Sequence, residues 1–260
     1  RRRARSVPPS YTRGMRTTAV PALLPVLLLG SCAWAGSPAW QQAAGGDEAA
    51  RERMVVRQLE GRDITDRRVL DAMRAVPRHL FVPPGLRDRA YDDTPLPIGH
   101  GQTISQPYIV ALMTQLVRPG PADRALEIGT GSGYQAAILA RLVQEVYSIE
   151  IVEPLAREAE ERLRELGFGN VTVRAGDGYR GWPERAPFDI VMVTAAPDHL
   201  PPALLEQLGP GGRLVIPIGP RGGGQVLRLF EKDREGRVAS RDVAPVLFVP
   251  LVRAGAPAGR

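Results

Sequence analysis

Three glycines spaced two residues apart, Gly129, Gly131 and Gly133, follow an apolar run that contains one acid, Glu127. Glycine adopts positive φ without strain and lets a ligand lie against the main chain, so this spacing predicts a binding turn. The spacing does not exclude a dinucleotide, because counting from Gly131 places Ala136 at the last position of the G-x-G-x-x-G/A pattern. Glu127 favours a different ligand. A negatively charged pyrophosphate gains nothing from a carboxylate at that position, whereas a ligand with an ammonium group would be attracted to it.

Two further acids stand at the ends of apolar runs downstream of the glycines. Glu150 closes the run 145–150, and Asp177 lies between two glycines after the run 171–175. Because a carboxylate has two acceptor oxygens, Glu150 can bind both hydroxyls of an adenosine ribose, and Asp177 can accept from an adenine amino group. Glu150 suits a dinucleotide as well, but that ligand leaves Asp177 unexplained. With Glu127 in E-x-G-x-G-x-G, the chain resembles class I methyltransferases, which use S-adenosyl-L-methionine.

Strands and helices must alternate to bring these acids together. Apolar runs predict buried strands at 125–128, 145–150, 171–175, 188–194 and 213–218, with helices at 136–140 and 154–166 between them. The runs 225–230 and 243–249 indicate a terminal antiparallel pair. This pattern predicts an α/β fold with a doubly wound, mostly parallel seven-stranded sheet, Rossmann-like, whose ligands bind at the carboxyl ends of the strands. Glu127, Glu150 and Asp177 all fall on that edge.

The segment before the sheet predicts a helical extension. A helix covers 48–59, and Asp66 can cap a second one whose apolar face includes Val69 and Met73. Residues 81–97 are rich in Pro, Gly and Asp and indicate an irregular loop. Apolar residues at helical spacing after Pro107 predict another helix, and Ser105 stands where its N-cap belongs, with proline in the first turn.

Charge and composition argue against several function classes. The net charge is +6, but six arginines precede the first acid, Asp47, and from there on 28 basic residues face 28 acidic ones. The folded part is therefore expected to be neutral, with no polyanionic partner such as nucleic acid. Cys32 is the only cysteine, so no disulfide framework or cysteine-rich metal site is expected. The three histidines, at 79, 100 and 199, lack metal-ligand spacing and are expected to be surface or structural residues.

Residues 1–46 differ from the rest and are separated from the expected methyltransferase domain at 47–260. From Met15 a single arginine precedes an apolar stretch at 19–30 and then Cys32, as in a bacterial lipoprotein signal, while residues 33–35 suit an ordinary cleavage site. The apolar stretch is too short and too interrupted by proline to span a bilayer as a stable helix. The alternative is a misassigned start, with the true one near Met54.

Longer runs across the chain carry a closer resemblance: 69–83, 101–107, 126–134, 176–178, 187–189, 193–197 and 248–251. Over about residues 50–252 the sequence resembles the protein-L-isoaspartate O-methyltransferases, most specifically in 102–107. In that family the serine that corresponds to Ser105 is treated as the active-site residue, and the loop before it lines the cofactor and peptide cleft. The expected cofactor-binding residues are Gln102, Thr103, Ile104, Ser105, Glu127, Gly129, Gly131, Gly133, Glu150, Asp177 and Gly178.

The resemblance implies methyl transfer from S-adenosyl-L-methionine to the free α-carboxylate of an L-isoaspartyl residue, which initiates repair through a succinimide. Since such a carboxyl has a pKa of about 4, it is ionised at neutral pH and needs no general base. A dry site that positions it accelerates the transfer by proximity and desolvation. Ser105 would orient the carboxylate through its hydroxyl and the adjacent helix N-terminus.

The implied partners are isoaspartyl-containing proteins and peptides. We expect a monomer without membrane contact of the folded part, in the cytoplasm because the cofactor is made there. Export or lipid anchoring through Cys32 is the alternative location. Two rival functions stay open from the sequence: a class I methyltransferase with a small-molecule acceptor, and a non-catalytic nucleotide-binding module. Methylation of an isoaspartyl peptide against a panel of small acceptors separates them.

Overall fold

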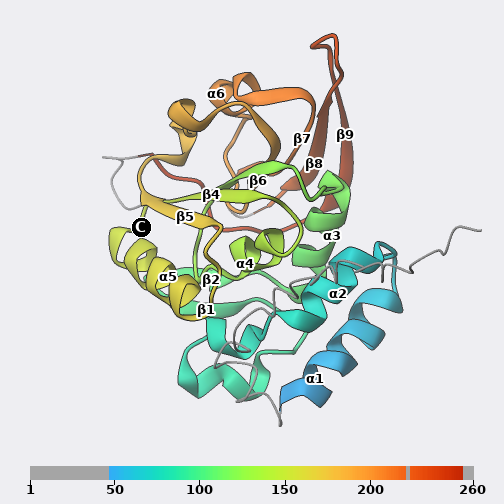
Figure 1. Cartoon of the computed structure of the whole chain (residues 1–260), viewed down its shortest axis with the longest axis vertical. Coiled ribbons are helices and arrows are strands. Elements are labelled where there is room, and N and C mark those ends of the chain that lie inside the picture. The colour runs from blue at the N-terminus through green and yellow to red at the C-terminus, as the bar shows by residue number, and fades with distance from the viewer. Residues whose placement is uncertain (1–46, 221–222, 254–260) are drawn as a thin grey trace, which may run out of the picture. The chain divides into compact units, whose positions relative to one another are not determined.

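The structure is a computed structural model that describes residues 47–220 and 223–253 (Figure 1). The signal-like stretch 19–30 and Cys32 lie outside the described residues. No helix in the described ranges is both long and apolar enough to cross a membrane.

A seven-stranded sheet organises the described part of the chain (Figure 1), in the order β5-β4-β3-β6-β7-β8-β9. Neighbours from β5 to β7 pair in parallel, and β8 and β9 add two antiparallel strands at one edge. After β3 the chain winds outward through β4 to β5 and then returns to β6 on the other side of β3. The switch point therefore lies between β3 and β6. The strands are β3 Arg124–Ile128, β4 Glu145–Glu150, β5 Val171–Ala175, β6 Phe188–Val193, β7 Leu208–Ile218, β8 Val226–Lys232 and β9 Val238–Pro245.

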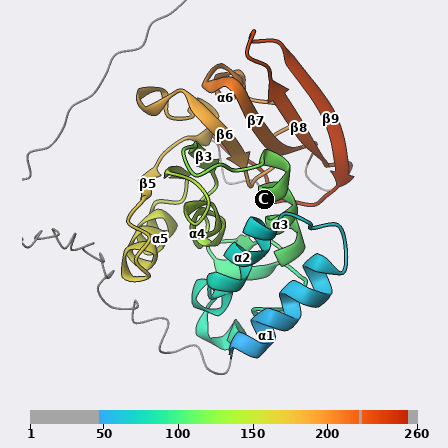
Figure 2. The ribbon, with the colours of Figure 1, turned by 45° about the vertical axis from the view of Figure 1, so that its right-hand side comes forward.

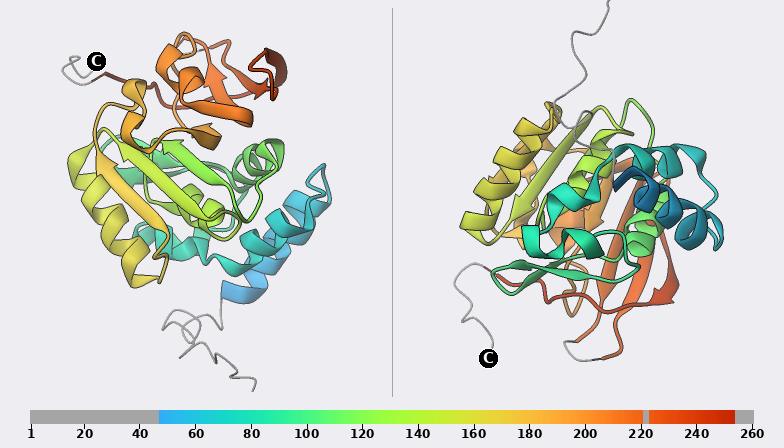
Figure 3. Two further views of the ribbon diagram at one scale, coloured as in Figure 1. Left: turned by 45° about the horizontal axis from the view of Figure 1, so that its top comes forward. Right: turned by 90° about the horizontal axis from the view of Figure 1, so that it is seen from below.

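Helices cover both faces of this sheet, which confirms the predicted doubly wound α/β fold (Figures 2 and 3). One face packs against α2 (Arg67–Ala75), α3 (Pro107–Val117), α4 (Tyr134–Ala140) and α5 (Glu153–Glu165). The other face packs against the short α6 (Pro202–Glu206) and two 3₁₀ turns, Gly178–Arg180 and Pro183–Arg185. The N-terminal helical extension begins with α1 (Asp47–Met54), which continues as a π-helical segment, Val55–Glu60.

Strands β3 to β6 lie within a residue of their predicted positions, β7 begins five residues before its predicted start, and β8 ends two residues after its predicted end. The last strand differs most. The sequence predicted a strand over 243–249, whereas β9 spans Val238–Pro245, is mostly exposed and has no apolar pattern to reveal it. The apolar run beyond β9 is instead held by one buried residue, Gln225, through its backbone and its side chain. Val246 N donates to Gln225 O (3.0 Å), and Phe248 N donates to Gln225 Oε1 (2.6 Å). Bonds to this single residue satisfy the segment without extending the sheet.

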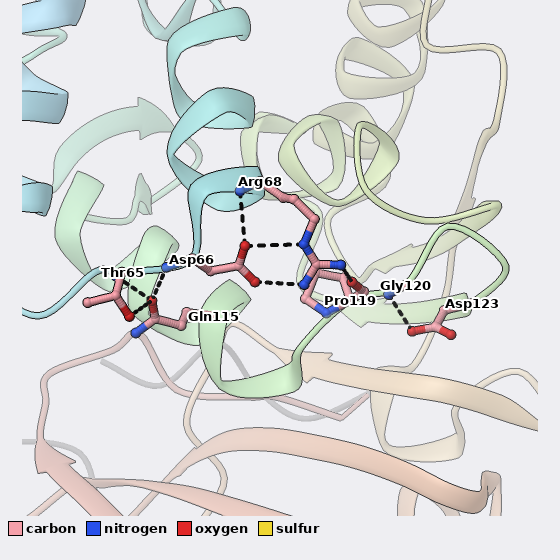
Figure 4. A network of polar contacts seen from close by, with 7 residues as sticks. All are labelled: Thr65, Asp66, Arg68, Gln115, Pro119, Gly120 and Asp123. Carbon is pink, nitrogen blue, oxygen red and sulfur yellow. Dashed lines mark hydrogen bonds and ion pairs between the residues drawn. The ribbon is translucent and has the colours of Figure 1, made fainter.

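The cap predicted at Asp66 is confirmed (Figure 4). Its Oδ1 accepts from Arg68 N (2.9 Å) at the start of α2. Gln115 of α3 reaches the same point, since its Oε1 accepts from Thr65 N (2.7 Å) and Asp66 N (2.8 Å). These bonds fix the start of α2 against α3.

The cap predicted at Ser105 is wrong. The N-cap of α3 is Gln106, which makes no side-chain cap bond, and the helix begins at Pro107. Proline at the first helical position fixes φ and has no N–H to satisfy, so a capping side chain has less to do there.

The predicted irregular loop 81–97 also contains regular structure. A 3₁₀ helix spans Pro84–Arg89, and β1 (Leu96–Gly99) pairs antiparallel with β2 (Gln102–Ile104). The two strands turn at Gly99, His100 and Gly101, all with positive φ. This hairpin brings the 102–105 segment over the sheet edge where the acids were expected.

Candidate active site

The glycine turn has the conformation that its spacing predicts. Gly129, Gly131 and Gly133 have φ of +95°, +54° and +89°. A Cβ at Gly129 would collide with the Thr194 hydroxyl, so only glycine fits there. A Cβ at Gly131 would meet only Ile98 Cδ1, at 3.4 Å, because this position borders open space. Main chain at Gly131 is therefore accessible to a ligand.

A cavity of about 480 Å³ lies over the carboxyl ends of β3, β4 and β6, at the switch point. Its volume is within the usual range of about 300–1,000 Å³ for small-molecule sites. We call it the main cavity. Its other walls are the β1–β2 hairpin and residues 249–252. The expected residues that line it are Gln102, Thr103, Gly129, Gly131, Glu150 and Gly178.

Glu150 ends β4 and points into this site with only 4% of its surface exposed. Its Oε2 accepts from Gly131 N (2.8 Å), and its Oε1 accepts from Val152 N (3.0 Å). Each oxygen can accept at least one more bond, so the carboxylate can hold the glycine turn and bind ligand hydroxyls at the same time.

Glu127 lies near the end of β3, as predicted, but its side chain does not face a ligand site. It is absent from the main-cavity lining and fully buried, with Oε2 accepting from Ser148 Oγ. Ser148 is its partner in the β3–β4 register, and Ser148 Oγ lies 2.6 Å from Thr130 Oγ1. Burial raises the pKa of Glu127 to about 8. Glu127 therefore supports Thr130 through Ser148 from beneath the turn and does not face the main cavity.

Asp177, Gly133 and Ile104 also lie just outside the main cavity. Asp177 Oδ1 caps a 3₁₀ turn by accepting from Tyr179 N (2.9 Å), and its neighbour Gly178 lines the cavity. This cap uses one carboxylate oxygen, so the other can accept from a ligand. Gly133 is the N-cap of α4, and Ile104, the last residue of β2, is 5% exposed.

Ser105 belongs to a second pocket. This apolar pocket, of about 460 Å³, lies between residues 245–249, Pro95 and Ile109. Ser105 also borders a small cavity of about 30 Å³ against the glycine turn, but it does not line the main cavity. Thr103 and Thr194 line all three spaces. The main cavity and the apolar pocket therefore meet at these two threonines, beside Ser105.

Arg78, which sequence reasoning did not single out, holds the main chain at Ser105. It is completely buried, and its Nη2 donates to Ser105 O (2.7 Å) while its Nε donates to Ala90 O (2.8 Å). Its guanidinium carbon lies 4.8 Å from the centre of the ring of Tyr134, the residue that follows the glycine turn and begins α4. Burial lowers the pKa of Arg78 to about 10, so it is charged at neutral pH. One side chain thus connects the Ser105 loop with α4.

Other lining residues were missed for different reasons. Thr194 directly follows β6, so the rule that ligands bind at strand ends could have found it; its Oγ1 lies 2.6 Å from Gly129 O, to which it donates. Residues 249–252 reach the site through long-range bonds that no local pattern indicates: Ala196 pairs with 249 and 251, and the Tyr179 hydroxyl donates to Leu251 O (3.2 Å). His100, expected to be a surface or structural residue, lines the main cavity with its side chain 40% exposed. Among residues 47–220 and 223–253, no three potential metal ligands come together.

Comparison with known proteins gives a consistent result. Residues 50–256 match the family model described as protein-L-isoaspartate(D-aspartate) O-methyltransferase. The protein-L-isoaspartate O-methyltransferase of Opitutus terrae is 61% identical over 203 residues, which cover 78% of this chain and 87% of that protein. The protein-L-isoaspartate O-methyltransferase 2 of Syntrophobacter fumaroxidans is 53% identical over 240 residues, covering 88% and 96%.

A solved structure agrees with the sequence relatives. A putative protein-L-isoaspartate O-methyltransferase from Plasmodium falciparum, in complex with S-adenosyl-L-homocysteine, superposes with a TM-score of 0.67 at 27% identity. The similarity covers 78% of this chain and 98% of that one.

Proposed function

Because this chain belongs to the protein-L-isoaspartate(D-aspartate) O-methyltransferase family, we propose which of its residues perform the reaction. The protein transfers a methyl group from S-adenosyl-L-methionine to the free α-carboxylate of L-isoaspartyl residues and so initiates their repair through a succinimide. The two rival functions are not favoured, since the relatives carry this activity in their names.

The residues of the main cavity fit S-adenosyl-L-methionine. Glu150 is buried at the wall and offers acceptor oxygens suited to ribose hydroxyls. Gly131 leaves main chain open, where even one Cβ would enter the ligand space. Gly178 lines the cavity, and its chain neighbour Asp177 can accept a hydrogen bond from the adenine amino group. Gln102 and Thr103 close the site from the hairpin. Glu127 acts indirectly in this proposal, through Ser148 and Thr130.

When bound, the cofactor supplies a methyl group on a positively charged sulfur that a carboxylate oxygen can attack. The chain has to bring the isoaspartyl carboxylate to that point, keep it ionised and exclude water. Ser105 is the proposed catalytic residue, because its hydroxyl can donate to the carboxylate where the two pockets meet. Arg78 holds the Ser105 main chain at the same place.

The N–H groups at the start of α3 contribute less to orienting the substrate carboxylate than the sequence implied. Pro107 has no N–H, and Tyr108 N already points to Asp93 Oδ1 at 3.3 Å. With these two groups unavailable, orientation of the carboxylate depends mainly on the Ser105 hydroxyl.

The observation that carries the proposal is the junction at Thr103 and Thr194, which line both a cofactor-sized cavity and the separate pocket that contains Ser105. Its test is transfer of labelled methyl to an isoaspartyl peptide, with the matching aspartyl peptide and a panel of small carboxylic acids as controls. Label in the isoaspartyl peptide alone supports the proposal. Equal or better transfer to small acids contradicts it.

The remaining proposals concern the context of the enzyme. We propose a monomer that does not bind nucleic acid and acts in the cytoplasm, where its cofactor is made. Sedimentation of the purified chain, with and without DNA, tests the first two points. Palmitate label on Cys32 in a bacterial host would contradict the third in favour of a lipid anchor.

A further inference from the structure

The apolar pocket beside Ser105 exposes a large hydrophobic side chain. Leu247 is 78% exposed, more than the other exposed large hydrophobic residues of the described ranges, such as Val56 (45%) and Val238 (42%). A single exposed leucine needs no explanation by itself. Leu247 differs because it lines a pocket of about 460 Å³ that also borders the proposed catalytic residue.

The Leu247 backbone is held in place on both sides. Gln225 is 2% exposed and binds Phe248 through both ends of its amide, with Phe248 N to Oε1 at 2.6 Å and Nε2 to Phe248 O at 3.2 Å. Val246 N donates to Gln225 O at 3.0 Å, and Ala196 N donates to Val249 O at 2.8 Å. A ligand that packs on Leu247 therefore meets a surface that is already ordered, which lowers the entropy lost on binding.

The lining of this pocket has no charged side chain. Of its polar members, Thr103 and Thr194 also line the main cavity, Ser105 lies beside them and Gln106 follows in the chain, whereas Pro245 to Val249 and Ile109 form its apolar side. A charged group on that side would lose hydration without gaining a partner. An apolar side chain would gain from burial there.

We propose that the apolar pocket binds an apolar side chain on a residue next to the isoaspartyl residue, and that Leu247 determines this specificity. The inference rests on the proposed function. An isoaspartyl carboxylate at Ser105 places the adjoining residues of the same peptide about one residue spacing away, roughly 3.8 Å, and the pocket is continuous with that point. Its occupant is therefore part of the substrate.

The test uses isoaspartyl peptides that are identical except for leucine, glutamate or lysine at the positions flanking the isoaspartyl residue. On the wild-type enzyme we expect kcat/KM for a leucine-flanked peptide to exceed that for both charged peptides by at least about tenfold, on one side of the isoaspartyl residue or both. In Leu247→Glu this preference is lost, and the lysine-flanked peptide becomes a better substrate than on wild type. The KM for S-adenosyl-L-methionine stays unchanged.

Val238→Glu is the matched control, because it makes the same chemical change at an exposed position on β9 outside the pocket. It should keep the wild-type preference. A wild-type enzyme indifferent to the flanking residues, or a Leu247→Glu enzyme that loses activity equally on all three peptides, would overturn the inference. Failure to methylate any isoaspartyl peptide would instead contradict the proposed function itself.

Discussion

Replacing Ser105 by alanine should separate activity from stability. The hydroxyl is half-buried, is not the cap of α3, and accepts or donates no hydrogen bond within the described residues. Removing a hydroxyl without a hydrogen-bond partner changes the free energy of unfolding by less than about 0.5 kcal/mol. A hydrogen bond to a charged group contributes about 1.5–3 kcal/mol. Since about 1.4 kcal/mol is a factor of ten, we expect kcat/KM for an isoaspartyl peptide to fall roughly ten- to a hundredfold.

Ser105→Asp should be worse than Ser105→Ala. A second negative charge would face the anionic substrate in a site shielded from water, where charges interact more strongly than in solution. Cofactor affinity should change less than turnover in both variants, because Ser105 lies outside the main-cavity lining.

The measurements are urea unfolding and steady-state kinetics on the same preparations. Ser240→Ala on the exposed strand β9 is the matched control and should change neither quantity. The reasoning is refuted if Ser105→Asp is as active as wild type. It is also refuted if Ser105→Ala loses 1 kcal/mol or more of stability, as a capping residue would, with activity intact.

Other substitutions test the cofactor site and the buried acid. Glu150→Ala and Asp177→Ala should each weaken S-adenosyl-L-methionine binding by about 1.5–3 kcal/mol in calorimetry; unchanged affinity in both would contradict the assignment. Glu150→Ala should also lower the melting temperature more, since Glu150 satisfies two backbone N–H groups and Asp177 one. Gly131→Val should abolish cofactor binding and cost about 1–2 kcal/mol of stability, because a side chain would enter the cavity at positive φ. The pKa of Glu127 rises from 4.5 to about 8 on folding, so the folded state holds a proton there and unfolding becomes easier as pH rises between these values. Urea unfolding at pH 6.5, 7.5 and 8.5 should show this decline in wild type and a smaller one in Glu127→Gln; parallel profiles would argue against a protonated Glu127.

The sheet was predictable because its information is local. Buried parallel strands are continuous apolar runs, and the turn after β3 has glycine wherever φ is positive. Glu150 was located correctly because it ends such a run. The predicted cap at Ser105 failed by one residue, and boundaries are the least certain part of any prediction from sequence pattern.

The direction of a side chain within the site was less predictable. Glu127 faces Ser148 because of the register between β3 and β4, which the sequence of either strand alone does not specify. Arg78 contacts Ser105, Thr194 contacts Gly129, and Phe248 beside Leu247 contacts Gln225, each across more than 20 residues of the chain. Only the strand-end position of Thr194 left a local sign.

The walls contributed by residues 246–252 have a consequence for the order in which a working enzyme comes into existence. Synthesis proceeds from the N-terminus, so the strands β3 to β7 and the glycine turn are made long before the segment that closes both pockets. A chain cut after Pro245 would keep all seven strands of the sheet and lose a wall of the main cavity together with Leu247. We therefore expect methyl transfer to begin only after residues 246–252 have been made, so that a nascent chain stopped before them does not use up cofactor.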